Sequence, residues 1–333
     1  MMRILFFLFL SSMGWLPAAA QKVELLTSGT HSSFRGLSVV GNDIVWVSGS
    51  NGVVGRSLDG GKTWEWITVP GHEKRDFRDI EAFDKNTAII MAIAEPAVLL
   101  KTTDGGKTWK QVYINDTPGM FLDAMEFWNK DSGIVLGDPI KGRFFVARTF
   151  DRGESWHEIP FMELPTADSG EACFASSGTN VRRLKKDEAC FISGGLRSRL
   201  FIRDQQIDLP LIQGTASTGA NSMAVWDQDH LVVVGGDFTH DTAREKNCVL
   251  TRDEGRTWII PATPPHGYRS CVEYVAMGKL ICCGTSGVDI STDGGMNWQL
   301  IDGGSFHVCR KAKKGEAVFL AGGGGRVAKL TTF

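Results

Sequence analysis

Three arginines directly follow an aromatic residue at comparable points of the chain, in Phe34-Arg35, Phe77-Arg78 and Tyr268-Arg269. A guanidinium group can hold a carboxylate or another anion through two parallel hydrogen bonds. If the fold brings the three together, we expect an anion-binding surface. The alternative is that these arginines pair with nearby acids such as Asp79, Asp123 and Glu171 and line a solvated channel.

Further polar residues occupy equivalent positions and are expected to share this surface, namely Asp138, Glu171, Asn221, Asp237 and His307. We expect the three acids among them to set specificity. Asp237, His240 and Asp241 resemble a metal-ligand cluster only weakly, and His240 is better explained as a solvated side chain. The sequence therefore predicts a site for a protein or another anionic ligand, with no metal.

No pattern of covalent or cofactor chemistry is present. The chain contains neither the G-x-S-x-G of serine hydrolases nor the H-E-x-x-H of zinc proteases. Gly-Lys-Thr occurs twice, but the first glycine of a phosphate-binding loop would fall at Arg56 and Lys101. The glycine run that begins at Gly322 is explained by a hairpin turn. We therefore expect no cofactor and no catalytic residue.

The elements that would position these residues are given by a short repeat of the form S/T-x-D-x-G-x-T-W. Its five copies place these aspartates and tryptophans, which we expect to be structural: Asp59 and Trp64, Asp104 and Trp109, Asp151 and Trp156, Asp253 and Trp258, Asp293 and Trp298. The aspartate can accept hydrogen bonds from the backbone that follows it and close a turn. The tryptophan can pack where neighbouring sheets meet.

The spacing of these boxes predicts the number of repeats. They lie about 40 to 50 residues apart, except for one interval of about twice that length. A degenerate box at Arg203-Asp204 fills that interval and gives six repeats. A seventh is expected from strands at 306–311, 317–322 and 325–331, completed by an N-terminal strand at 22–28. The sequence thus predicts an all-β, seven-bladed propeller of four-stranded antiparallel blades over residues 21–333.

Each repeat is expected to contain four strands, which in the first are 34–40, 44–48, 53–57 and 64–69. The turn between the second and third strands recurs as G-x-x-G, at Gly49/Gly52, Gly284/Gly287 and Gly322/Gly325. The boxes lie on one face of such a propeller, called here the box face. The innermost strands begin on the opposite face, called here the channel face, where the candidate residues should meet.

The first twenty residues predict export. The positively charged N-terminal segment, residues 1–3, is followed by an unbroken apolar run at 4–10 and by Ala18-Ala19-Ala20 before Gln21. This order is typical of a cleaved signal peptide, and the run is shorter than the ~20 residues of a membrane span. We expect a periplasmic or secreted protein that begins at Gln21, without a membrane span and monomeric.

Composition and cysteine content add two expectations. The 333 residues include 36 basic and 38 acidic ones, for a net charge of -2, without a long basic run. Nucleic acid is therefore not an expected partner, because phosphate binding requires clustered positive charge. Seven cysteines lie mostly in apolar runs. An exported protein could form disulfides, but the odd number and the apolar surroundings favour buried free thiols.

The repeats, the Phe-Arg strand starts and the segments that begin at Gly137 and Gly170 resemble the photosystem II stability/assembly factor family of Asp-box propellers. More narrowly, the chain is similar to exported members from non-photosynthetic bacteria. The resemblance covers essentially the whole mature chain. It implies a non-catalytic factor whose arginine-rich face binds a partner polypeptide, with Arg35, Arg78 and Arg269 as the patch. Leu122, Glu171 and Asn221 depart from that pattern.

The competing hypothesis is a sialidase-like glycoside hydrolase, because Asp boxes also occur in sialidases. The segment Phe34-Arg35-Gly36-Leu37 resembles the F-R-I-P start of those enzymes without its proline. Tyr268 and Glu171 would then form the nucleophile pair. Sialidases have six blades, whereas the spacing here predicts seven, and no feature of the sequence identifies the acid/base carboxylate that the reaction needs.

Overall fold

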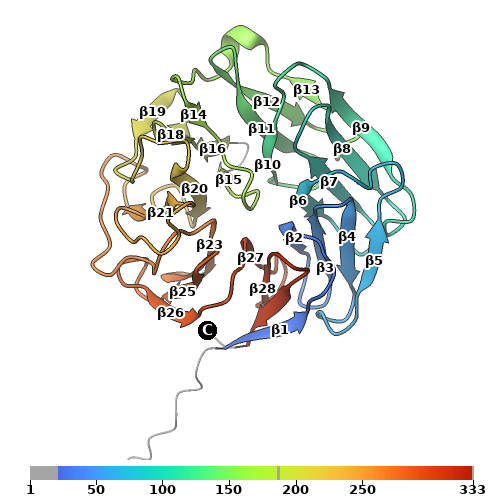
Figure 1. Cartoon of the computed structure of the whole chain (residues 1–333). Helices are drawn as coiled ribbons and strands as arrows, with labels where there is room; N and C mark the ends of the chain where they lie inside the picture. Colours follow the sequence, from blue (N-terminus) through green and yellow to red (C-terminus); the bar gives the residue numbers. More distant parts are fainter. Residues whose placement is uncertain (1–21, 186–187, 332–333) are drawn as a thin grey trace, which may run out of the picture.

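The computed structural model describes residues 22–185 and 188–331. The expected signal peptide, residues 1–20, and Gln21 lie outside this part of the chain. Within it, the strands form seven sheets arranged in a ring around a central axis, as Figure 1 shows; the space around this axis is called here the channel. The all-β, seven-bladed propeller predicted from the repeats is confirmed. No helix among the described residues is long and apolar enough to cross a membrane.

Four blades consist of four consecutive antiparallel strands each, numbered from the channel outward. Blade 1 contains β2 (Phe34–Val39), β3 (Val45–Gly49), β4 (Val53–Ser57) and β5 (Glu65–Thr68). Blade 2 contains β6 (Phe77–Ala82), β7 (Ala88–Ala92), β8 (Ala97–Thr102) and β9 (Lys110–Asn115). Blade 3 contains β10 (Leu122–Phe127), β11 (Gly133–Ile140), β12 (Arg143–Thr149) and β13 (His157–Glu158). Blade 6 contains β23 (Cys271–Ala276), β24 (Lys279–Gly284), β25 (Gly287–Ser291) and β26 (Gln299–Asp302).

Blades 4 and 5 are less regular. Blade 4 contains β15 (Val181–Lys185), β16 (Glu188–Ile192), β18 (Arg199–Ile202) and β19 (Gln205–Asp208). Blade 5 contains β20 (Thr218–Val225), β21 (Leu231–Asp237) and β22 (Cys248–Thr251), and its sheet also includes β14 (Glu171–Ala172) and β17 (Gly194–Gly195). A single 3-10 turn, η1 (Phe161–Glu163), precedes β14. The degenerate box of blade 4 is a two-residue turn, since Ile202 pairs with Gln205 across it.

Blade 7 closes the ring. It contains β27 (Val308–Lys311), β28 (Val318–Ala321) and β29 (Val327–Leu330), and its outer strand is β1 (Val23–Thr27). β1 pairs antiparallel with β29, with Val23 opposite Leu330. Figure 1 shows the blue N-terminal strand beside the red C-terminal ones. The predicted closure by the N-terminal strand is confirmed, and it leaves the ring without an open joint.

The Asp boxes form the turns that the repeat predicted. In the first, Asp59 accepts hydrogen bonds from the backbone N–H and the hydroxyl of Thr63, at 2.9 and 2.6 Å. These bonds lower the pKa of Asp59 to about 2. The indole N–H of Trp64 donates to the carbonyl of Gly61 at 3.0 Å, which fixes the ring against the turn. The backbone bond recurs in the other four intact boxes, and in the last of them the side-chain donor is the amide of Asn297 instead of a hydroxyl.

The apolar cores lie between neighbouring blades. One cluster joins blades 6, 7 and 1, and another joins blades 1 and 2 around Trp46. All seven cysteines are buried free thiols in the described residues, as their apolar surroundings predicted. Since each core is shared, the position of every innermost strand is fixed by the blades on both sides of it.

Candidate binding pocket on the channel face

Two of the three arginines lie at the start of an innermost strand. Phe34 and Phe77 are buried, and each begins a strand in which the next residue is a β-bulge. A bulge turns the extra residue out of the regular pairing. Arg35 and Arg78 are therefore directed away from the core, and both are partly exposed.

These arginines line a pocket of about 530 Å³ on the channel face. Of the predicted site residues it contains Arg35, Arg78, Asp138, Asn221 and His307. Its aromatic walls are formed by Phe121, Phe174, Phe238 and Tyr268. A mostly apolar wall with a few convergent polar groups is the usual composition of a ligand site.

The cationic side of the pocket is only partly neutralised. Arg78 forms an ion pair with Asp76 at 2.8 Å. Arg35 has no carboxylate partner among the described residues, and its single hydrogen bond is a long one of 3.5 Å to the carbonyl of Ser176. Burial, followed by the charge of Arg78, lowers the pKa of Arg35. An incoming anion would relieve this unfavourable environment.

His307 contributes no positive charge at neutral pH. Burial and the charges of Arg35 and Arg78 lower the pKa of His307 to about 3. Its Nε2 lies 3.2 Å from the hydroxyl of Ser33. His307 therefore acts as a neutral hydrogen-bonding group beside the two arginines.

The pocket also contains an acid, Asp138. Burial raises the pKa of Asp138 to about 6, although its carboxylate accepts the backbone N–H of Cys173 at 2.8 Å. Asp123 lies behind it, fully buried, and neither of its carboxyl oxygens has a hydrogen-bond partner. Burial and the charge of Asp138 raise the pKa of Asp123 well above its usual range. The raised pKa values of Asp138 and Asp123 reduce the negative charge in this part of the pocket.

The expectation that Arg269 joins the patch is corrected by the structure. Its side chain is fully buried, and its Nε lies 2.7 Å from a carboxylate oxygen of Asp289. The reason is the register of the strand start. The backbone N–H of Arg269 donates to the carbonyl of Gly235 in the preceding blade, just as the backbone N–H of Phe34 donates to the carbonyl of Gly322. Arg269 therefore corresponds to Phe34 and faces inward, while Ser270 occupies the position of Arg35.

Glu171 also lies outside the pocket. The innermost strand of blade 4 begins at Val181, so Glu171 belongs to the connection before it and not to a strand start. Its carboxylate is buried against Arg199, whose Nε lies 2.8 Å away, and also binds Ser193. The structure thus places this carboxylate among buried partners outside the pocket, where it contributes to the fold.

Asp237 does not line the pocket either, although its neighbour Phe238 does. Its carboxylate accepts the hydroxyl of Thr239 at 2.7 Å and contacts His240 at 2.8 Å. Asp241 instead accepts the hydroxyl of Thr285 at 2.7 Å. Within this weak metal-like cluster, Asp237 and His240 thus pair with each other, whereas the carboxylate of Asp241 binds Thr285.

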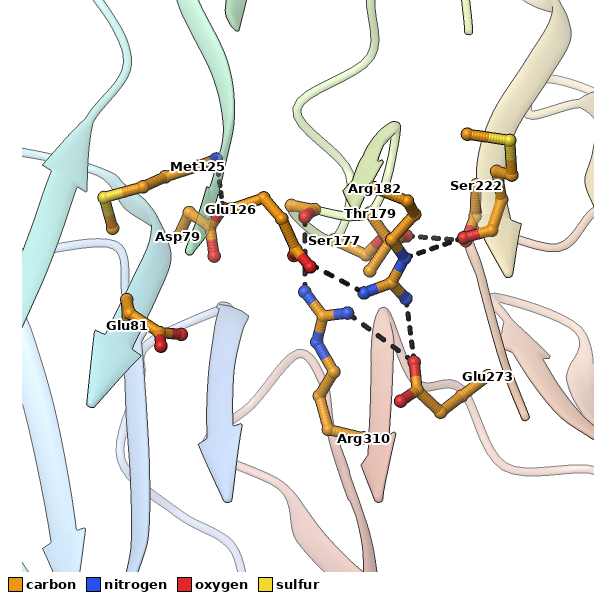
Figure 2. Close-up of polar contacts among 12 residues, drawn as sticks. Asp79, Glu81, Met125, Glu126, Ser177, Thr179, Arg182, Ser222, Glu273 and Arg310 are labelled. Carbon is orange, nitrogen blue, oxygen red and sulfur yellow. Dashed lines mark hydrogen bonds and ion pairs between the residues drawn. The ribbon is translucent and has the colours of Figure 1, made fainter. Parts of the chain in front are cut away.

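Sequence reasoning missed a segment that crosses the channel, residues 174–180, called here the channel segment. Ser177 donates to the carbonyl of Ser270 in blade 6 at 2.7 Å, and Thr179 contacts Ser222 in blade 5 at 2.5 Å. Figure 2 shows Ser177 and Thr179 among side chains from the surrounding blades. Its only signal in the sequence is the unusually long connection between Trp156 and the next innermost strand.

Gly178 allows this crossing. It has a φ of 65°, and a Cβ there would lie 2.3 Å from the carboxylate of Asp79 in blade 2. The carbonyl of Gly178 accepts a hydrogen bond from Arg310 of blade 7 at 3.2 Å. The channel segment therefore separates the pocket on the channel face from the other end of the channel.

Comparison with known proteins supports the family resemblance. The family model described as photosynthesis system II assembly factor YCF48 matches residues 18–120. The predicted resemblance to this family is confirmed. No curated protein is significantly similar to the chain in sequence.

Several solved structures share the fold of this chain at low sequence identity. A structure titled YCF48 bound to D1 peptide has a TM-score of 0.66 and 16% identity, and the alignment covers 96% of this chain and 97% of that one. YCF48 from Cyanidioschyzon merolae has a TM-score of 0.65 and 17% identity, with 94% and 99% covered. The WD40 propeller of Doa1 has a TM-score of 0.63 and 12% identity, with 93% and 97% covered. At these identities the similarity shows the fold alone.

Proposed function

We propose that this protein is an exported, non-catalytic binding protein whose channel-face pocket holds an anionic segment of a partner polypeptide. The observation that carries the proposal is Arg35, a partly exposed guanidinium without a carboxylate partner among the described residues, beside Arg78 in a pocket with aromatic walls. A carboxylate on the partner would bind these arginines, and apolar side chains would contact the walls.

The comparisons support a polypeptide ligand. The family model that matches the chain describes an assembly factor, and one structure of similar fold is that of YCF48 with a D1 peptide. The proposal of export rests on the character of residues 1–20, and the partner would then be located in the periplasm or outside the cell.

The sialidase-like alternative requires an activated tyrosine. Tyr268 instead donates to the amide oxygen of Asn221 at 2.8 Å, and burial raises the pKa of Tyr268 to about 12. Glu171, the proposed activating carboxylate, is bound to Arg199. The geometry therefore assembles no Tyr–Glu nucleophile pair, and it favours the binding function.

A cross-linking capture experiment from the native envelope tests the proposal. The mature protein is compared with the Arg35→Ala/Arg78→Ala variant and with Arg152→Ala/Arg256→Ala, which removes two arginines from exposed box turns. We expect a polypeptide that is captured by the mature protein and the control but lost with the pocket variant. Each charge-assisted contact contributes about 1.5–3 kcal/mol, so the affinity should fall at least tenfold.

Equal capture by all three proteins would contradict the proposal, because the arginines would then only line the channel. A large drop in the thermal unfolding midpoint of the pocket variant would show a structural role instead. Release of a fluorescent leaving group from sialosides or other glycosides would favour the enzymatic alternative.

A further inference from the structure

A second cavity opens at the other end of the channel, on the box face, where the innermost strands end. It consists of two adjoining pockets of about 500 and 520 Å³. Four residues line both of them and join them into one groove, Glu126, Arg182, Arg183 and Glu273. This groove, called here the box-face mouth, lies across the channel segment from the pocket described above.

The floor of the box-face mouth is a network of charges from innermost strands, shown in Figure 2. Arg182 binds Glu273 at 2.7 Å and lies 3.8 Å from Glu126. Arg310 approaches Glu273 at 3.6 Å. Arg182 comes one residue after the first pair of its strand, and Glu273 and Arg310 come two residues after theirs. Glu126 comes two residues after Ala124, the first pair beyond the bulge of β10, so the charges form a layer around the channel.

The carboxylates of this floor are engaged within the protein. Glu81 is held by Lys313 at 2.6 Å. Asp79 accepts two backbone N–H groups, from Ile80 at 2.8 Å and Met125 at 2.7 Å. Burial raises the pKa of Asp79 to about 7 and also raises the pKa of Glu126. Each acid of the floor is therefore paired with a cation, or burial raises its pKa.

The rim carries an excess of positive charge. Lys130, Arg183 and Lys314 are exposed, and none of them has a carboxylate partner among the described residues. The guanidinium of Arg183 makes a single hydrogen bond, which it donates to the carbonyl of Trp128 at 3.3 Å. On a chain with a net charge of -2, unpaired cations gathered around one cavity indicate complementarity to an anion.

Aromatic residues lie between these cations. Trp128 and Tyr274 line the mouth, and Trp226 at its edge is 41% exposed and packs against Tyr274 at 5.7 Å. The cations belong to blades 3, 4 and 7, and the innermost strands of blades 4 and 7 lie on opposite sides of the channel in Figure 1. An ion of phosphate size could not contact them all, whereas an extended chain could.

We propose that the box-face mouth is a second binding site, which holds an acidic, extended polypeptide segment. Acidic side chains of that segment would bind Lys130, Arg183 and Lys314, and its apolar groups would pack on Trp226 and its neighbours. This site is separate from the proposed function of the channel-face pocket, so either can fail without the other.

Fluorescence anisotropy with a labelled, glutamate-rich peptide that contains tryptophan tests this site. The probe is titrated with the mature protein and with the Lys130→Gln/Arg183→Gln/Lys314→Gln variant. Loss of an exposed ion pair weakens binding by roughly two- to fivefold, so we expect a decrease of about tenfold or more for three. Binding should also weaken as salt rises, because exposed charges are screened.

Matched variants locate the binding. Lys22→Gln/Lys62→Gln/Lys107→Gln replaces three exposed lysines that line neither pocket of the mouth. This variant should bind the peptide as tightly as the mature protein does. Arg35→Ala/Arg78→Ala removes the arginines of the channel-face pocket, so the binding that it retains reports the mouth. The probe should still bind this variant and should be lost when Lys130→Gln/Arg183→Gln/Lys314→Gln is added to it. Loss of the probe in the channel-face variant alone, or unchanged binding after the mouth substitutions are added, would overturn the second site. Lys130→Gln/Lys314→Gln serves as a milder variant if the triple one unfolds at a lower temperature.

Two further probes distinguish other anions. The same peptide with glutamine in place of glutamate should not bind. If the mature protein binds inorganic pyrophosphate or vesicles of phosphatidylglycerol, but not the glutamate-rich peptide, the polypeptide assignment is wrong. The absence of binding to every probe would also overturn it.

Discussion

Replacement of Arg269 by alanine is expected to unfold the protein more readily without any direct effect on a ligand site. The guanidinium is fully buried, and Asp289 binds its Nε at 2.7 Å. The guanidinium of Arg269 also donates to the carbonyl of Tyr268 at 2.8 Å and to the hydroxyl of Ser286 at 2.9 Å. In the alanine variant, the fully buried carboxylate of Asp289 would keep one side-chain partner, the imidazole Nδ1 of His266 at 2.6 Å.

The size of the effect follows from burial. Removal of one partner of a buried ion pair costs about 3–5 kcal/mol, because the other charge remains without compensation. With an unfolding entropy of ~2.1 cal/mol/K per residue, each kcal/mol lowers the unfolding midpoint of a chain of 333 residues by roughly 1.5 °C. We therefore expect Arg269→Ala to lower the midpoint by roughly 4–8 °C.

Urea and thermal unfolding, followed by tryptophan fluorescence, measure this change. Arg35→Ala is the matched control, because it removes the same group from a partly exposed position, and it should cost less than about 1 kcal/mol. An Arg269→Met/Asp289→Leu variant should recover much of the loss, since apolar residues can replace a buried ion pair. If Arg269→Ala and Arg35→Ala unfold alike, the reasoning from burial and register is refuted.

Three further changes test the channel and its pocket. Gly178→Ala should destabilise the fold by about 1–3 kcal/mol in urea unfolding, because its Cβ would meet the carboxylate of Asp79 and its φ of 65° is unfavourable for alanine; an unchanged midpoint would contradict the close packing. Burial raises the pKa of Asp79 to about 7, so the native state binds a proton that the unfolded state releases, and the free energy of unfolding should fall as pH rises from about 4 to 7. Asp79→Asn should remove that part of the pH dependence, measured as the difference from the unmodified protein. Burial raises the pKa of Asp138 to about 6, so affinity for an anionic peptide should weaken as pH rises through about 6, and Asp138→Asn should bind it with less dependence on pH.

The fold could be predicted because its signals are local. In each Asp box the aspartate binds groups four residues later, as Asp59 binds Thr63, so the turn is encoded within one short stretch. The box spacing then gives the number of blades. The degenerate box at Asp204 could be placed because its neighbours on either side keep the period.

The site was harder to predict because it depends on register and on distant contacts. Tyr268-Arg269 has the same residue types as Phe34-Arg35, but its arginine is one position earlier relative to the strand pairing and is therefore buried. Only the partner strand, at Gly235, reveals that shift. The salt bridge between Glu171 and Arg199 likewise joins residues whose proximity no local pattern indicates.

The channel segment determines how the two ends of the channel relate to each other. Its Ser176 carbonyl faces Arg35 on one side, and its Gly178 carbonyl accepts a hydrogen bond from Arg310 on the other. Both ends of the channel thus contact one segment, which blades 5 and 6 hold through the side chains of Ser177 and Thr179. Because these bonds and the lack of space at Gly178 fix the segment, a ligand at one end cannot move it without breaking buried hydrogen bonds. We therefore expect ligands on the two faces to bind independently, with additive free energies, unless a partner is large enough to contact both faces.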